Sequence, residues 1–209
     1  MSDDVLLTPW YFIRHAPVLN AKQGLYNSHD EGAILPDVKV IEKMSRQLPN
    51  DALWYVSPFK RATQTALALT AEPDNIKYAN ALKEQNFGDW QGLKFDELWQ
   101  EIKNIEGHNW SYISATTKPP KGESFCDVQR RVRKFLDEIV DVEPTKPRII
   151  VTHAGVIRAF ISLILNVDAD AALSFKFDTF SLTTCLHQTG SLKGGAWQMQ
   201  SLNQTFTES

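Results

Sequence analysis

Histidine and arginine, the residue types that phosphate chemistry needs, stand at or near the ends of apolar runs in this sequence. Arg14 and His15 directly follow one such run, and His153 follows another. Arg61 lies a few residues beyond a third. If these runs are parallel buried strands, the side chains that follow them lie at one edge of the sheet. Since guanidinium groups match phosphate oxygens and an imidazole nitrogen can attack phosphorus, the sequence predicts a phosphate pocket there.

His15 is the expected nucleophile of this pocket. Phosphoryl transfer to an unprotonated ring nitrogen would split ester hydrolysis into two steps. Nearby arginine charges are expected to lower the pKa of His15, and its other ring nitrogen is expected to donate to a carbonyl. Arg14, Arg61 and His153 are expected to stabilise the charge on the phosphoryl oxygens. The leaving alkoxide needs a proton, and Glu84 is the candidate acid.

Five segments rich in apolar residues predict the strands that position these side chains, at 10–13, 53–56, 148–152, 180–187 and 197–202. Helical patterns alternate with the first three of them. This alternation predicts an α/β fold with a mainly parallel sheet that is covered on both faces. We found no internal repeat or linker within residues 1–209, which predicts a single domain.

Capping residues indicate where three helices begin. Ser57 followed by Pro58 is typical of an N-cap and a first helical residue. Ser124 with Asp127 resembles a capping box, and the helix after it has a clear apolar face. Another helix is expected to open at Gly155, directly after the third strand.

Tryptophans follow the predicted acid along the chain. Residues 93–103 have apolar side chains at helical spacing, which predicts that Trp99 lies in the core. Trp90, Trp99 and Trp110 could line a pocket for an aromatic leaving group, but the more common role of such residues is core packing.

The composition excludes several classes of partner. The chain has 209 residues and a net charge of −3, so a local positive cluster must attract any anionic substrate. The densest basic stretch, residues 130–134, has acidic neighbours and is interpreted as a solvated helix face, so no nucleic-acid partner is expected. No apolar run could span a bilayer, and Asp3 and Asp4 stand where a signal peptide is basic. We therefore expect a cytoplasmic protein without a membrane partner.

Five segments resemble, in order, the motifs of the histidine phosphatase superfamily, also called the phosphoglycerate mutase-like family. They are residues 12–16 (Phe-Ile-Arg-His-Ala), 57–66, 82–92, 122–124 (Gly-Glu-Ser) and 151–158. Each motif alone would be weak, but the five in the same order span most of the chain. The family fold is a three-layer α/β/α sandwich, in agreement with the pattern of strands and helices.

The resemblance implies a role for each candidate residue. His15 would be phosphorylated, and Glu84 would donate a proton and later act as the base for water. The phosphate would be held by Arg14, Arg61 and His153, with Ser57 near it. The family uses no metal and no other cofactor for this chemistry, and the implied substrate is a small phosphorylated metabolite.

Residues 24–30 resemble those of α-ribazole phosphatases, a subgroup of this family that acts in cobalamin synthesis. Ala16 replaces the usual glycine after the nucleophile, as it often does in that subgroup. Asn27 stands where the subgroup usually has glycine, and asparagine tolerates a left-handed backbone. The resemblance therefore implies α-ribazole 5′-phosphate as a substrate, with specificity determined by residues 17–35 and 101–121.

Two other functions stay open at this point. A phosphoglycerate mutase would return the phosphoryl group to a product, but such mutases usually have additional sequence before the second histidine. A catalytically inactive phosphate-binding module is disfavoured because the charged site residues and Glu84 are all present. The sequence also leaves the oligomeric state open, a homodimer included.

Overall fold

A six-stranded sheet forms the centre of the computed structural model, which describes residues 5–18, 31–70, 72–190 and 193–207. The strands are β1 (Leu7–Arg14), β2 (Leu53–Val56), β3 (Ile76–Tyr78), β4 (Arg148–Thr152), β5 (Leu182–Gln188) and β6 (Trp197–Gln204). Their order is β3-β2-β4-β1-β5-β6. The first four pair in parallel, whereas β5 and β6 are antiparallel. The predicted α/β class with a mainly parallel sheet is confirmed.

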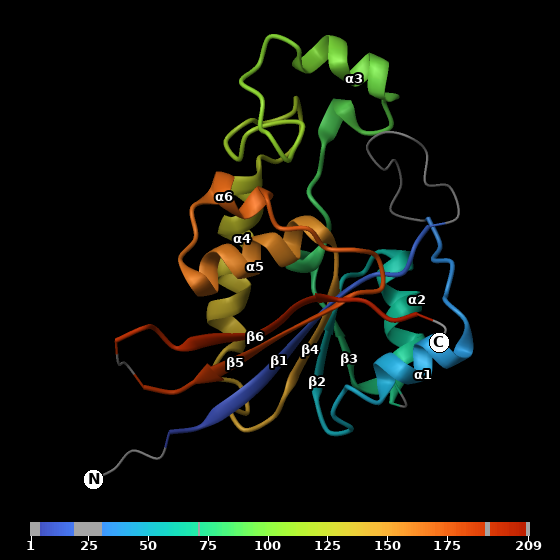
Figure 1. Ribbon diagram of the computed structural model, residues 1–209, viewed down its shortest axis with the longest axis vertical. Helices are drawn as coiled ribbons and strands as arrows, with labels where there is room; N and C mark the ends of the chain where they lie inside the picture. The colour runs from blue at the N-terminus through green and yellow to red at the C-terminus, as the bar shows by residue number, and fades with distance from the viewer. Residues whose placement is uncertain (1–4, 19–30, 71, 191–192, 208–209) are drawn as a thin grey trace.

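Helices cover both faces of this sheet, as Figure 1 shows. The helices are α1 (Val38–Ser45), α2 (Lys60–Leu69), α3 (Phe95–Ile102), α4 (Phe125–Ile139), α5 (Ala154–Leu165) and α6 (Ala169–Leu173). α4 and α5 pack on one face, and α1 and α2 pack on the other. The result is the expected three-layer arrangement. Within the described ranges, no helix is long and apolar enough to cross a membrane.

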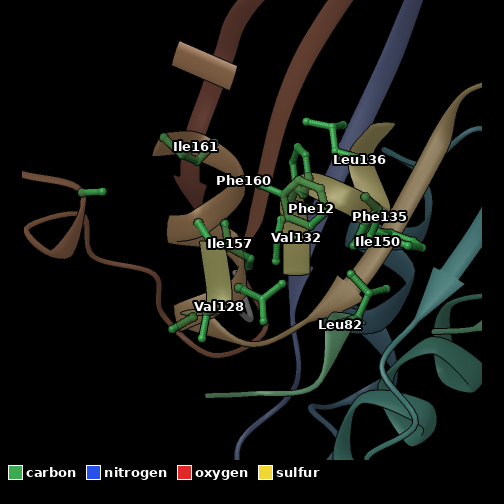
Figure 2. Close-up of a cluster of buried hydrophobic side chains, with 14 of the residues drawn as sticks. Phe12, Leu82, Val128, Val132, Phe135, Leu136, Ile150, Ile157, Phe160 and Ile161 are labelled. Carbon is green, nitrogen blue, oxygen red and sulfur yellow. The ribbon is translucent and has the colours of Figure 1, made fainter. Parts of the chain in front are cut away.

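The larger core lies between the sheet and the α4–α5 pair (Figure 2). Phe12 of β1 and Ile150 of β4 point into it, where they meet Val132 of α4 and Phe160 of α5. All four side chains are fully buried. The predicted capping box that starts α4 is also confirmed, since Ser124 and its partner at the third helical position bond reciprocally. This packing fixes β1 and β4 side by side, and with them the residues that follow each strand.

The smaller core lies on the opposite face and holds α2 close to the strands. Ala62 and Ala66 of α2 are fully buried against Val56 and Val151. These small side chains let the helix backbone approach the sheet closely. The first turn of α2, which includes Arg61, is thereby held beside the ends of β1 and β4.

Two predicted helix starts are wrong, one by two residues and the other by one. α2 begins at Lys60 with Phe59 as its N-cap, and Ser57 does not cap it. The backbone N–H of Ser57 instead continues the parallel sheet and donates to the carbonyl of Val151 (3.0 Å). Ser57 therefore remains extended, and its hydroxyl is available to another partner. α5 begins at Ala154, one residue before the predicted Gly155.

The predicted burial of Trp99 is wrong, because 51% of its surface is exposed. α3 lies apart from the central sheet (Figure 1). Only a narrow stripe of α3, formed by Leu98 and Ile102, is covered, in a separate small cluster with Trp90. Trp90 is buried as predicted, whereas Trp110 is 75% exposed and does not belong to a core. Strand β3 was missed because it is a mostly exposed edge strand.

Candidate active site

The carboxyl ends of β1, β2 and β4 bring the predicted site residues together. Arg14 pairs with Thr152 in the parallel register of β1 and β4. The backbone N–H of His15 donates to the carbonyl of Thr152 (2.9 Å), so the pairing continues beyond the strand ends. His153 follows directly, and its ring centroid is 5.0 Å from that of His15. The expectation that these strand ends meet is confirmed.

The two ring nitrogens of His15 have different partners. Nδ1 lies 2.7 Å from the carbonyl oxygen of Ala16, and a carbonyl can only accept, so Nδ1 carries the proton. Nε2 is then unprotonated and accepts from Nε of Arg61 (3.3 Å). The backbone N–H of Ala16 donates to Thr65 Oγ1 (2.9 Å), which fixes the chain after His15. This is the tautomer that the sequence predicted, with Nε2 as the nitrogen able to attack.

His15 remains neutral at physiological pH. Burial is the main cause, followed by the positive charge of Arg61 and then that of Arg14, and together they lower the pKa of His15 from 6.5 to about 3. The side chain is only 2% exposed. Arginine charge was predicted to lower this pKa, but burial contributes more.

His153 is fully buried beside His15. Its Nε2 lies 2.8 Å from the hydroxyl oxygen of Ser57. Its Nδ1 has no hydrogen-bond partner among the described residues. Burial, followed by the electrostatic interaction with His15 and by the positive charge of Arg61, lowers the pKa of His153 well below its usual value. Ser57, which the sequence had suggested as a helix cap, thus orients the second histidine.

The two arginines approach the histidines from different elements. Arg14 ends β1, and its Nη1 donates to the carbonyl of Phe177 (2.6 Å). Its buried Nε has no partner within the described part of the chain. Arg61 comes from the first turn of α2 and is 2% exposed. Both arginines line one cavity of about 670 Å³, which supplies the local positive charge that an anionic substrate would need.

Glu84 lines the same cavity and faces the start of α5. Its Oε1 accepts from the backbone N–H of Gln85 (3.0 Å). A Cβ at Gly155 would lie 2.6 Å from Oε1, so glycine at that position leaves room for the carboxyl group. The predicted acid therefore lines the same cavity as Arg14 and Arg61, whereas the buried His15, Ser57 and His153 are not among its lining residues.

Arg131 is a residue of this site that the sequence interpretation missed. It was predicted to belong to a solvated helix face, but its side chain is only 21% exposed and forms an ion pair with Glu123 (2.9 Å). Its guanidinium also donates to the carbonyls of Ala81 and Lys83, which flank the segment leading to Glu84. Its neighbours Arg130, Arg133 and Lys134 are exposed as predicted.

Glu123, the ion-pair partner of Arg131, also bonds the loop that follows Glu84. One of its carboxylate oxygens accepts from the backbone N–H of Asn86 (3.0 Å), and its own N–H donates to the carbonyl of Asn86 (2.7 Å). Gln85 Nε2 donates to the carbonyl of Glu123 (2.8 Å). The Gly-Glu-Ser motif at residues 122–124 contains Glu123, so a signal for this residue was present in the sequence. No sequence signal indicated that Arg131 is its partner.

Most of one predicted specificity segment lies outside the part of the chain that the structure describes. Residues 24–30, which resemble α-ribazole phosphatases, lie outside the described part of the chain, as does most of the predicted specificity segment 17–35. Within the described residues, no group of three or more histidine, cysteine, aspartate or glutamate side chains could hold a metal ion. The expectation that no metal takes part stays a prediction.

This constellation and the fold define a known class. The chain belongs to the histidine phosphatase superfamily (branch 1), whose family model matches residues 10–205. A protein of Mycobacterium tuberculosis described as bifunctional is 31% identical over 150 residues, which are 71% of this chain. The chain spans only 40% of the length of that relative.

Other similar proteins match along nearly their whole length. The adenosylcobalamin/alpha-ribazole phosphatase of Escherichia coli K12 is 24% identical over 202 residues, 94% of this chain and 91% of that protein. Among solved structures, one titled mycobacterial hydrolase 2 superposes with a TM-score of 0.80 at 22% identity, and covers 97% of this chain and 93% of its own. The structural likeness confirms the phosphoglycerate mutase-like fold.

Proposed function

We propose that this protein is a metal-independent phosphatase of small phosphate monoesters, with Nε2 of His15 as the nucleophile. The observation that carries the proposal is the state of His15: its proton is on Nδ1, and its pKa is lowered to about 3. The neutral imidazole contacts Arg61, which lines the cavity together with Arg14, and it is thereby suited to attack on a phosphate bound by these arginines.

The first step follows from these positions. A phosphate group would take the place of His15 Nε2 as the partner of Arg61 Nε, and Arg14 would bind other phosphate oxygens. Nε2 then forms a bond to phosphorus while the bond to the leaving oxygen breaks. Glu84, as the carboxylic acid, gives its proton to that oxygen, and the alcohol leaves. The fixed donors of the arginines stabilise the charge that develops on the phosphoryl oxygens.

The second step uses the same residues in reverse roles. Glu84, now a carboxylate, takes a proton from water as the water oxygen attacks phosphorus. The bond between phosphorus and Nε2 breaks, and inorganic phosphate leaves. His153 would donate from Nδ1 to the phosphoryl group; the support is that this nitrogen has no partner in the described chain, while Nε2 contacts Ser57.

Within this class, α-ribazole 5′-phosphate is the first substrate to test. The support is the near full-length similarity to the Escherichia coli phosphatase and the resemblance of residues 24–30.

The test is release of inorganic phosphate from a panel of monoesters in the presence of EDTA, which includes α-ribazole 5′-phosphate and 3-phosphoglycerate. We expect release by the wild type and none by His15→Ala, whose fold is checked by circular dichroism. Equal release by both proteins would refute the role of His15. Isomerisation of 3-phosphoglycerate with a bisphosphoglycerate primer, without release, would indicate a mutase instead.

A further inference from the structure

The cavity that contains Arg14 and Arg61 is much larger than a phosphate group. Its volume of about 670 Å³ falls within the range of roughly 300–1,000 Å³ that is usual for pockets of organic ligands. Aromatic side chains contribute much of its wall, namely Phe59, Phe87, Trp90, Trp110, Tyr112 and Phe125. A leaving group of three carbons would fill only a small part of this space.

Trp110 is the most exposed of these aromatic residues, at 75%, and Tyr112 follows at 52%. Both belong to the segment after α3, which lies with α3 at one end of the molecule (top in Figure 1). An indole offers a large flat face for stacking, and such contacts accept many kinds of ring. The exposed faces of Trp110 and Tyr112 are therefore available to a ligand in the cavity.

The turn that carries Trp110 is anchored to α6. The backbone N–H of Trp110 donates to Nδ1 of His108 (3.1 Å), and Nε2 of His108 donates to the carbonyl of Asp170 (2.9 Å). The Asp170 carboxylate in turn accepts from the backbone N–H of Ala115 (2.6 Å). The backbone of the turn is thus held at both of its ends, so that less backbone entropy is lost when Trp110 binds a ligand.

Charge in the cavity favours a neutral leaving group. Residues 110–114 carry no charge, so they offer no ion pair to a second acidic group. Among the other cations of the lining, Lys83 has its Nζ 6.0 Å from the centroid of the Phe59 ring, which Arg61 also contacts, so it lies toward the phosphate end. Arg131 is paired with Glu123. Arg158 donates to the carbonyl of Phe175 and interacts electrostatically with Glu84. The phosphate end is cationic, whereas the end formed by residues 110–114 is aromatic and uncharged.

We propose that the substrates are phosphate monoesters whose leaving group carries a flat aromatic ring, as a nucleoside does, and that Trp110 binds this ring. The inference rests on the proposed phosphatase function, because it assigns the alcohol part of the same substrate. Trp110 acts in specificity and takes no part in the transfer of the phosphoryl group.

The test compares adenosine 5′-monophosphate with ribose 5-phosphate, which have the same kind of primary leaving oxygen but differ in the ring. We expect kcat/KM to be about tenfold or more higher for the nucleotide in the wild type. Trp110→Ala should remove about tenfold of that preference, through KM for the nucleotide, and should change kcat/KM for ribose 5-phosphate much less. Trp110→Phe should keep most of the preference, because it retains an aromatic face.

Trp99→Ala is the matched control, since Trp99 is also an exposed tryptophan, on α3, but does not line the cavity. It should leave both substrates unchanged. A wild type without preference for the nucleotide, or a Trp110→Ala variant that loses the same factor for both substrates, would overturn the proposal.

A binding measurement separates this proposal from the proposed function. Calorimetry with His15→Ala and with the double variant His15→Ala/Trp110→Ala measures affinity for the same two compounds without turnover. Tighter nucleotide binding that depends on Trp110 supports ring recognition even if the wild type releases no phosphate, which would count against the phosphatase function alone. Equal affinity of the two compounds for His15→Ala would contradict ring recognition.

Discussion

The chemistry of His15 is determined by the partners of its two ring nitrogens and by its burial. Nδ1 donates to the carbonyl of Ala16, and Nε2 accepts from Arg61, so the nitrogen directed at the guanidinium is the basic one. Ala16 stands where the family usually has glycine. Its methyl group takes no space from the cavity, because it is buried in the smaller core under α2. The proposed nucleophile is thereby neutral throughout the physiological pH range.

Burial of neutral His15 should make folding sensitive to acid. Its pKa is about 3 in the folded protein and about 6.5 in the unfolded chain, so between these values only the unfolded chain binds the proton. The free energy of unfolding is unaffected by His15 above pH 6.5 and falls as the pH drops through this window. We expect His15→Gln to reduce the slope by up to about 1.4 kcal/mol per pH unit.

Urea unfolding at several pH values from 7.5 to 4.5 measures this slope for wild type and variant. The buried His153 contributes an acid dependence of the same sign, which the variant retains and which serves as the internal reference. Identical slopes for the two proteins would show that His15 is not buried as a neutral group.

Glu84→Gln should slow turnover most for substrates with poor leaving groups. An amide keeps the shape of the side chain but cannot supply the proton that an alkoxide needs, and general acids typically contribute about 10²–10⁴-fold. We expect a loss of at least ~10²-fold in kcat/KM for an alkyl phosphate and a much smaller loss for p-nitrophenyl phosphate. An equal loss for both substrates would argue against proton donation by Glu84.

At the scale of elements, helix α4 positions the loop that carries Glu84, the proposed acid, although Glu84 is not part of that helix. Arg131 of α4 holds the carbonyl of Lys83 (2.7 Å) and the carboxylate of Glu123, and Glu123 in turn fixes the backbone of Asn86. Glu84 lies between these anchored points. The loop that carries Glu84 is therefore joined to α4, a helix whose apolar face is buried in the larger core.

Arg131→Ala should lower kcat for alkyl phosphates by about tenfold while changing KM little, because it frees the loop of Glu84 and leaves the arginines at the phosphate end in place. It should also reduce the free energy of unfolding by about 1–3 kcal/mol, because Glu123 loses its charged partner. Arg133→Ala is the matched control, since Arg133 is exposed on the same helix.

A positioning role is distinguished from a purely structural one by the leaving group. If Arg131 acts through Glu84, its loss should slow p-nitrophenyl phosphate hydrolysis less than hydrolysis of an alkyl phosphate. A uniform loss for both substrates, in proportion to the loss of folded protein, would leave Arg131 with a structural role only.

Sequence patterns predicted the elements whose environment is uniform along their length. β4 is buried at every position and α4 has one continuous apolar face, so periodicity identified both. The start of α2 was predicted wrongly because Ser57 satisfies the signals of a cap, yet its N–H pairs with β4 and its hydroxyl with His153. Helix α3 has the period of a core helix, but Trp99 has no layer above it to pack against.

For the whole molecule, the phosphate end of the site could be predicted and the rest of the cavity could not. Arg14, His15 and His153 meet because parallel strands must end at one edge of a sheet, which follows from chain order. Trp110 and Arg131 enter the same cavity only through tertiary contacts between distant segments. The whole chain has a net charge of −3, yet several cations line one cavity. The sequence analysis expected such a local positive cluster for an anionic substrate.

The most direct test of the central claim is to trap the phosphorylated protein. Wild type mixed with a labelled phosphate monoester and denatured within milliseconds should carry a phosphoryl group that is stable in alkali and lost in acid, and mass spectrometry should locate it on His15. His15→Ala should carry none. Labelling at another residue, or rapid release of phosphate without labelling of His15, would contradict the mechanism.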